Sequence, residues 1–128
     1  MKPKAKLALA VVAAFALGGA VVEGLHAQAK AKAIYVVGEI DVTNLDAYTR
    51  EYTPKAQALI KQFGGQRLAG GQDVKSYQGA PPAQRVTIQR WDSVEQYEKY
   101  RNSAEFKENR DIGDKYAKFR TYSVGALN

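Results

Sequence analysis

The sequence predicts an α+β domain whose elements follow the order strand, helix, strand, strand, helix, strand. Residues 33–42 and 85–91 alternate apolar with polar side chains, as half-buried strands do. Residues 45–63 carry apolar side chains at spacings of three and four, which places them on one face of a helix. The chain has 128 residues, 45% of them hydrophobic and 25% charged, which suits a single globular domain.

The first 29 residues have the three parts of a secretory signal peptide. They open with three lysines, continue with an apolar run over 7–22 and end in Ala27-Gln28-Ala29, a small-residue cleavage motif. The run is shorter than the roughly 20 residues that cross a bilayer. We therefore predict a signal peptide over 1–29 that is cut after Ala29, and a periplasmic or secreted domain over 30–128 that is not attached to a membrane. An uncut membrane anchor is the alternative.

The first strand covers 33–42. Its alternation divides the side chains between two faces: Ile34, Val36, Ile40 and Val42 on one, and Tyr35, Val37, Glu39 and Asp41 on the other.

The first helix follows at once. Thr43 and Asn44 offer an N-cap, and Gly64-Gly65 ends the helix because glycine adopts the left-handed conformation at little cost. Pro54 interrupts the helical pattern, and proline in a regular interior costs about 3 kcal/mol. We therefore expect a kink at Pro54, or a restart of the helix with Pro54 near its first turn.

The second and third strands are joined by a glycine- and proline-rich segment. Short extended pieces at 67–69 and 74–78 flank Gly70-Gly71, where we expect a bulge or bend, and residues 79–82 form a turn. The third strand covers 85–91. Its two faces carry Val86 and Ile88 on one side, and Arg85, Thr87, Gln89 and Trp91 on the other.

The last third of the chain predicts a broken helix and a closing strand. Ser93 and Gln96 fit a capping box at the start of the helix. Residues 102–105 cap a second helical segment, and 118–124 form the last strand. The complete order is the ferredoxin-like βαββαβ pattern, an antiparallel sheet with both helices on one face.

One sheet face is therefore expected to lie beneath the helices and the other to remain open. We place Ile34, Val36, Val86 and Ile88 beneath the helices. The open face would then show Tyr35, Val37, Glu39, Thr87, Gln89 and Trp91. Tyr35, Val37 and Trp91 together are an apolar area too large to leave in water. Packing two such sheets face to face would bury it, so we predict a homodimer.

The mixture of aromatic and polar residues on that face is also typical of a ligand pocket. We predict that Tyr35, Arg85, Gln89 and Trp91 bind a small organic ligand and that Glu39 is a catalytic base. Two alternatives remain open. The polar groups sit at an interface rim and satisfy one another, or Glu39 and Arg85 form an ion pair between adjacent strands.

Several chemistries are excluded by residue types. The chain has no cysteine, and its one histidine, His26, lies in the predicted signal peptide. Thiolate catalysis, catalytic triads and histidine-bound zinc or haem are therefore excluded in residues 30–128. We expect no cofactor and no metal site. The net charge is +6, but positive and negative residues alternate without a one-signed stripe, so we expect no nucleic-acid partner.

Residues 33–125 resemble the family called domain of unknown function 1330. The stretches that carry this resemblance lie in the same order and spacing as in the family: 38–43, Tyr48, Tyr52, Gly64-Gly65, Pro81-Pro82, Trp91-Asp92-Ser93, 102–106 and 114–120. The resemblance implies a dimeric α+β barrel and no particular reaction.

Two functions follow as hypotheses. The first is a small-molecule-binding homodimer without an assigned reaction. The alternative is a cofactor-independent enzyme, of the isomerase or monooxygenase type, that acts on a small aromatic or lactone-like acid. The broader group of dimeric α+β barrels includes such enzymes, and this transfer is an analogy at the level of the fold.

Overall fold

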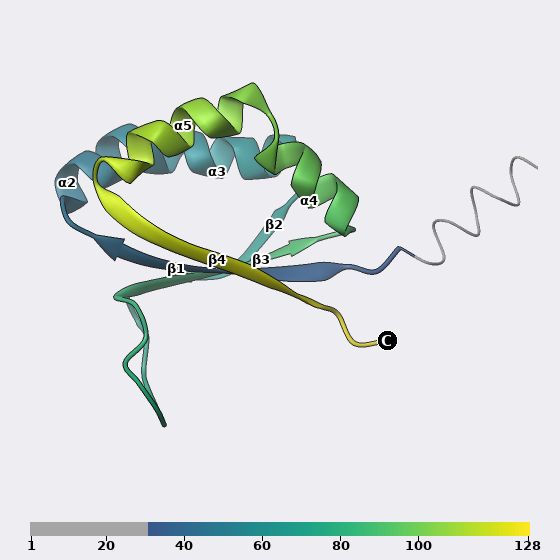
Figure 1. Ribbon diagram of the computed structural model, residues 1–128, viewed down its shortest axis with the longest axis horizontal. Helices are drawn as coiled ribbons and strands as arrows, with labels where there is room; N and C mark the ends of the chain where they lie inside the picture. Colours follow the sequence, from purple (N-terminus) through teal and green to yellow (C-terminus); the bar gives the residue numbers. More distant parts are fainter. Residues whose placement is uncertain (1–30) are drawn as a thin grey trace, which may run out of the picture. The chain divides into compact units, whose positions relative to one another are not determined.

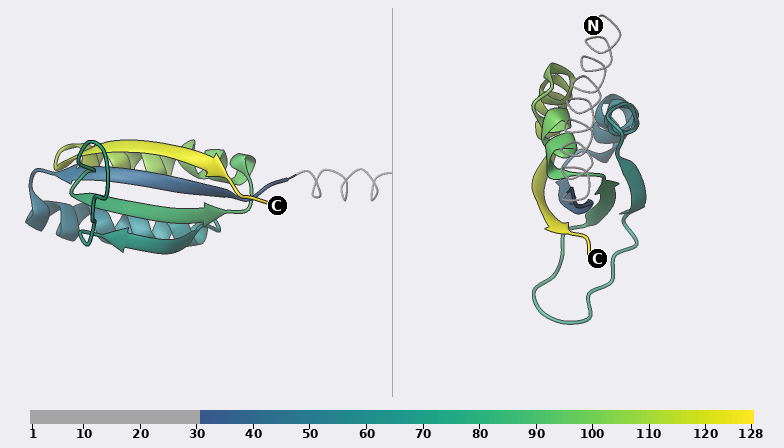
Figure 2. Two further views of the ribbon diagram at one scale, coloured as in Figure 1. Left: turned by 90° about the horizontal axis from the view of Figure 1, so that it is seen from below. Right: turned by 90° about the vertical axis from the view of Figure 1, so that its right-hand side faces the viewer.

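An antiparallel four-stranded sheet is covered on one face by helices in the computed structural model, which describes residues 31–128 (Figure 1). The strands are β1 (Ile34–Val42), β2 (Gln66–Gly71), β3 (Arg85–Trp91) and β4 (Ala117–Gly125). They lie side by side in the order β2-β3-β1-β4 (Figure 2). The ferredoxin-like prediction is confirmed. The predicted signal peptide over 1–29 lies outside the described residues.

The helical layer has two arms. The first arm runs through α2 (Leu45–Ala47), a π-helical turn η1 (Tyr48–Tyr52) and α3 (Thr53–Gln62). The second consists of α4 (Val94–Arg101) and α5 (Ala104–Asp114). Side chains cap the helices as predicted, since Asn44 accepts from the Ala47 N–H at 3.1 Å and Ser93 accepts from the Gln96 N–H at 3.1 Å.

Pro54 restarts the first helical arm, as expected. It lies in the first turn of α3, and the turn before it is widened, because the Thr53 N–H donates to the carbonyl of Tyr48 five residues back. Proline lacks an N–H, and its ring clashes with the carbonyl four residues earlier, so a regular turn is disfavoured there. The Thr53 hydroxyl also donates to Tyr48 O at 3.2 Å. The widened turn buries both Tyr48 and Tyr52.

The extended piece predicted at 74–78 is not a strand. The strand β2 ends at Gly71, and residues 72–84 form a loop that projects away from the helices (Figure 1). Gly71, the last residue of β2, has a φ of 137° and pairs with Val86 of β3. The strand β3 begins only one residue earlier, at Arg85. Within residues 31–128, no strand lies opposite 74–78 to pair with it. The pairing of β2 with β3 is irregular between Arg67 and Ala69, whereas Gly70 and Gly71, where a bulge or bend was expected, pair regularly with Thr87 and Val86.

The predicted faces of β3 were wrong. Directly opposite residues on neighbouring strands share a face, and Trp91, Gln89 and Arg85 lie opposite Ile34, Val36 and Ile40. The side of β3 that carries Arg85, Gln89 and Trp91 therefore faces the helices. Val86 and Ile88 instead share the open face of the sheet, which carries Tyr35, Val37, Glu39, Val86, Ile88, Tyr122 and Val124. Burying the indole of Trp91, which is 0% exposed, outweighs burying two smaller aliphatic side chains.

The hydrophobic core between sheet and helices is divided into two clusters. The larger consists of Ile34, Val36, Leu59, Ile60, Trp91, Tyr100 and Phe106. The smaller consists of Ile40, Tyr48, Tyr52 and Ala117. Between Val36 and Ile40 on β1 stands Gly38, which has no side chain to join the two clusters. The gap between the clusters is where the candidate site lies.

Candidate functional site

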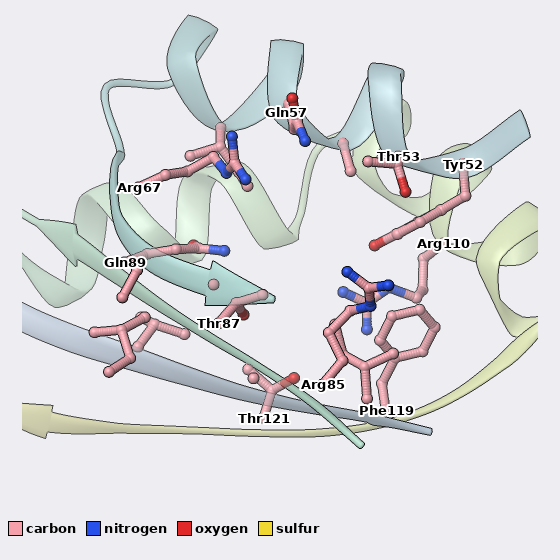
Figure 3. Close-up of a pocket in the computed structure, with 18 of the residues that line it drawn as sticks. Tyr52, Thr53, Gln57, Arg67, Arg85, Thr87, Gln89, Arg110, Phe119 and Thr121 are labelled. Atoms are coloured by element: carbon pink, nitrogen blue, oxygen red, sulfur yellow. The ribbon is translucent and has the colours of Figure 1, made fainter. Parts of the chain in front are cut away.

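A pocket of about 150 Å³ opens between the helices and the covered face of the sheet (Figure 3). Its walls come from both core clusters, because Val36 and Tyr100 line it on one side and Ile40 and Tyr52 on the other. The strands β1, β2, β3 and β4 and the helical segments η1, α3, α4 and α5 all contribute to it.

The floor of the pocket is a row of small residues that crosses the sheet. Strand register places Thr121, Gly38, Thr87 and Gly70 side by side on β4, β1, β3 and β2. Larger side chains stand on the rows to either side, such as Val36 and Ile40 on β1. A Cβ atom at Gly38 would lie 2.6 Å from Thr87 Oγ1, so even a methyl group does not fit there without movement. The missing side chains give the pocket its depth.

Three arginines line the pocket: Arg67 on β2, Arg85 on β3 and Arg110 on α5. Among the described residues, none of them has a carboxylate within ion-pair distance. The Nε atoms of Arg85 and Arg110 are buried and have no hydrogen-bond partner in the described chain. Buried donors of this kind are rare in native proteins, because leaving one unpaired costs about 1–3 kcal/mol.

Aromatic rings hold Arg85 and Arg110 in place. The Arg110 guanidinium lies 3.9 Å from the ring centre of Phe119 and 4.8 Å from that of Phe106. The Arg85 guanidinium lies 5.8 Å from the ring centre of Tyr48. Cation–π contacts fix the position of a guanidinium without using its N–H groups, and the Nε–H groups of Arg85 and Arg110 have no hydrogen-bond partner in the described chain.

The remaining polar groups also favour hydrogen-bond donation. Burial raises the pKa of Tyr52, and the nearby Arg110 only partly offsets this effect. Burial likewise raises the pKa of Tyr48, Tyr97 and Tyr100. These phenols therefore keep their protons at neutral pH and donate. No carboxylate, histidine or lysine is among the lining residues of the described chain. A pocket rich in donors and cationic groups is complementary to an anion.

Trp91 fixes the orientation of Gln89 in this pocket. The indole Nε1–H donates to Gln89 Oε1 at 2.9 Å. Because an indole N–H can only donate, the Gln89 side chain must present its oxygen to Trp91 and its NH₂ group elsewhere. Figure 3 shows that the Gln89 nitrogen points into the pocket. Gln89 thus becomes one more donor.

The residues predicted as one site lie on both faces of the sheet. Arg85 and Gln89 line the pocket, and Trp91 is buried beside it. Tyr35 and Glu39 lie on the open face. The structure therefore leaves Tyr35 on the same face as Glu39 and separates Glu39 from Arg85, Gln89 and Trp91. Whether Glu39 is catalytic stays a prediction.

The alternative of an ion pair between Glu39 and Arg85 was wrong. Arg85 lies opposite Ile40 and faces the helices, whereas Glu39 faces the open side. Glu39 instead pairs with Arg120 of β4 at 3.6 Å. A hydrogen bond to Glu39 also raises the pKa of Tyr122. The carboxylate of Glu39 therefore has structural partners on the open face.

Sequence reasoning missed Arg67, Arg110 and the tyrosines of the pocket. Arg110 carried a usable signal, because it stands four residues after Phe106 and so shares the buried face of its helix. Tyr48 and Tyr52 were assigned to the apolar face of the first helix, and nothing in that pattern separates a core tyrosine from a pocket tyrosine. Arg67 gave no signal, since its place depends on the register of β2.

The described part of the chain, residues 31–128, has neither a cluster of metal-ligating side chains nor a membrane-spanning helix. No group of three or more His, Cys, Asp or Glu side chains is placed to hold a metal ion there. No helix within residues 31–128 is long and apolar enough to cross a membrane.

The fold and the pocket define a class of protein: a ferredoxin-like α+β domain with a ligand-sized site between sheet and helices. Residues 33–127 match the family described as domain of unknown function (DUF1330), and the chain belongs to this family. No curated protein matches the chain.

Two solved structures are similar in fold. A protein of unknown function from Rhodopseudomonas palustris is 14% identical, with a TM-score of 0.62 over 77% of this chain and 85% of its own. SnoaB from Streptomyces nogalater, described as a cofactor-independent oxygenase, is 11% identical, with a TM-score of 0.57 over 77% of this chain and 96% of its own. At these identities the likeness establishes the fold.

Proposed function

We propose that the protein binds a small organic anion in the pocket between sheet and helices, with a carboxylate against Arg85 and Arg110. The observation that carries this proposal is the pair of buried guanidinium Nε–H groups that have no partner in the described chain. A carboxylate beside the two guanidinium groups would accept hydrogen bonds from them and would neutralise charge in a site that has no acidic residue of its own among its described lining.

The lining favours a planar organic acid over an inorganic anion. Aromatic rings surround Arg85 and Arg110, and aliphatic side chains such as Ile60 complete the walls. In another protein an apolar cavity of about 150 Å³ accommodates benzene. The pocket here has the same volume, so a single ring fits it, and benzoate is the simplest probe.

We predict that the purified protein binds benzoate and that Arg85→Gln weakens this binding roughly tenfold or more, since a hydrogen bond to a charged group contributes about 1.5–3 kcal/mol. Arg110→Gln should have an effect of similar size. Isothermal titration calorimetry at low salt measures both, with the thermal unfolding midpoint of each variant recorded to establish that it is folded.

The matched controls are Arg120→Gln and Glu39→Gln on the open face. Both should leave benzoate affinity within about twofold, because the sheet separates them from the pocket. If instead these two variants abolish binding and Arg85→Gln does not, the ligand lies on the open face and the proposal is wrong.

A cofactor-independent oxygenase or isomerase is the second candidate function. It is favoured by the similarity in fold to SnoaB, which is described as a cofactor-independent oxygenase. Donors in the pocket would stabilise an enolate or carboxylate substrate. The described lining contains no carboxylate or imidazole, and its tyrosines keep their protons, so the substrate itself must be readily deprotonated. Oxygen uptake with acidic phenols or enols, lost in Arg85→Gln, would support catalysis.

We further propose that the protein is a homodimer joined through the open face. That face exposes Tyr122 (46%) and Val124 (60%) and also carries Val37, Val86 and Ile88. Contiguous apolar surface of this kind is typical of an interface. Multi-angle light scattering should give the mass of two chains at micromolar concentration, and a well-folded monomer would contradict the proposal.

Export is a proposal that rests on the sequence of residues 1–29 alone. Mass spectrometry of the protein from its native source should find a mature chain that begins at Lys30. A chain that retains Met1 would contradict cleavage.

A further inference from the structure

The donors of the pocket fall into two groups at opposite ends (Figure 3). Arg85, Arg110 and Tyr52 form the inner group, next to the smaller core cluster. Arg67, Gln57 and Gln89 form the outer group. Arg85 and Gln89 stand four residues apart on β3, so their Cα atoms are separated by about 13 Å along the strand.

The outer group lies at the mouth of the pocket. Arg67 and Gln57 are exposed, whereas Arg85 and Arg110 are half-buried. Strand register places Arg67 directly opposite Gln89, and Trp91 turns the Gln89 amide so that its NH₂ group faces the pocket. Arg67 has no ion-pair partner in the described chain. The mouth is therefore a second cluster of unpaired donors.

The space between the two groups is lined by uncharged residues. Thr87, between Arg85 and Gln89 on β3, and Gly38 beside it form the floor, and Ile60 lines the opposite, helical wall. A single ring fits between the donors. An acid with one carboxylate satisfies the inner group only, and the outer guanidinium then has no acceptor.

We infer that the ligand is a one-ring acid with acceptor groups at opposite ends, as in benzene-1,4-dicarboxylate. This inference rests on the proposed function and specifies the ligand class for the same site. The inner carboxylate is held by Arg85 and Arg110, and the second acceptor is held by Arg67 with the Gln89 amide. Planar guanidinium groups bind carboxylates through two parallel hydrogen bonds, which suits both ends.

The test compares three probes by calorimetry on the same protein: benzoate, benzene-1,4-dicarboxylate and benzene-1,2-dicarboxylate. The last has the same charge as the 1,4-isomer, but both of its carboxylates lie at one end. We expect the 1,4-isomer to bind roughly tenfold or more tightly than either of the others. Arg67→Gln should remove this advantage and weaken the binding of benzoate much less than the binding of the 1,4-isomer. Arg50→Gln, at an exposed site of η1, is the matched control and should change nothing.

The outcomes separate this inference from the proposed function. If benzoate binds and loses affinity in Arg85→Gln, but the two dicarboxylates bind equally, the anion site at Arg85 and Arg110 is supported. The inference of a ligand with acceptors at both ends is then wrong. An equal effect of Arg67→Gln on benzoate and on the 1,4-isomer would also overturn it. If none of the three probes binds, both the inference and the proposed function fail.

Discussion

At the scale of single residues, the pocket depends on Gly38 and Thr87. These two residues lie opposite each other in the middle of the sheet, between rows that carry larger side chains. A Cβ at Gly38 would lie 2.6 Å from Thr87 Oγ1, closer than real atoms approach. Glycine in a strand costs about 0.5–1 kcal/mol relative to alanine, so the space that it leaves is obtained at the expense of stability.

We predict that Gly38→Ala destabilises the protein by about 1 kcal/mol and weakens benzoate binding, because overpacking outweighs the gain in backbone entropy. The same change made in a Thr87→Ala background should be neutral or stabilising, because the clashing hydroxyl is absent. Urea unfolding of the four proteins gives the coupling between the two positions. Effects that simply add would show that the two side chains do not meet.

The positions of the candidate site residues were only partly predictable from sequence. Arg85 and Gln89 were identified as ligand-binding and line the pocket. Trp91 was grouped with them because it shares their face of the strand, and that grouping was right although the face was assigned to the wrong side of the sheet. Alternation fixes which residues share a face. It does not fix which of the two faces the helices cover, when one face carries a tryptophan and the opposite face carries two aliphatic residues.

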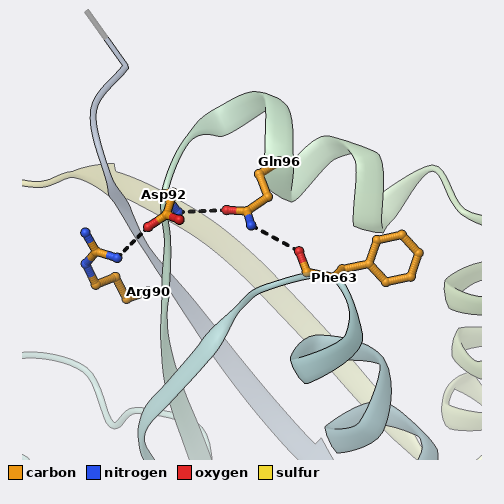
Figure 4. Close-up of polar contacts among 4 residues, drawn as sticks. All are labelled: Phe63, Arg90, Asp92 and Gln96. Atoms are coloured by element: carbon orange, nitrogen blue, oxygen red, sulfur yellow. Dashed lines mark hydrogen bonds and ion pairs between the residues drawn. The ribbon is translucent and has the colours of Figure 1, made fainter. Parts of the chain in front are cut away.

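At the scale of elements, the two helical arms are joined by the side chain of Gln96 (Figure 4). Its Oε1 accepts from the Asp92 N–H at 2.9 Å, and its Nε2 donates to the carbonyl of Phe63 at 3.1 Å. The capping box predicted for Ser93 and Gln96 is thus present in part. Ser93 caps the helix, but the Gln96 side chain accepts from the N–H of Asp92 instead of the N–H of Ser93, and it also contacts the end of α3. The bridge fixes the start of α4 against the first arm.

Gln96→Glu tests this bridge. A carboxylate can still accept from the Asp92 N–H, but it cannot donate to Phe63 O, which then faces a negative charge. We predict a loss of about 1–3 kcal/mol in the free energy of unfolding, measured by urea denaturation at neutral pH. Glu95→Gln, the reverse change at the exposed neighbouring position, should stay within about 0.5 kcal/mol. Equal, small effects at both positions would mean that the bridge contributes nothing.

The elements themselves were largely predictable, and their register was not. Periodicity located both helical arms and three strands, and Pro54 marked the restart of α3. The piece at 74–78 has the local composition of a strand but no partner strand opposite it. Pairing depends on where β2 bulges and where β3 begins, which is a long-range property that local patterns do not encode.

At the scale of the whole molecule, the pocket divides the core, and buried tyrosines lie on both sides of it. Tyr48 and Tyr52 belong to one cluster and Tyr100 to the other, with Tyr97 packed against the latter. Burial raises the pKa of all four. The folded state therefore holds these protons more tightly than the unfolded chain, in which the pKa of tyrosine is about 10.

The contribution of these tyrosines to stability is complete below about pH 10 and is lost as the pH rises further through their raised pKa values. We predict that the urea midpoint falls steeply above about pH 10. In an ultraviolet absorbance titration, four of the eight tyrosines should ionise only as the protein unfolds. Ionisation of all eight near pH 10 with the fold intact would contradict the burial described.

The central claim is that Arg85 and Arg110 form the anion site, and arginine side-chain NMR tests it most directly. Benzoate is titrated into ¹⁵N-labelled protein, and the Nε–H resonances are followed after assignment by Arg→Gln variants. The account predicts saturable shifts for Arg85 and Arg110, with Arg50 and Arg120 unchanged. Shifts confined to Arg120, or no saturable shift at Arg85 and Arg110, would contradict it.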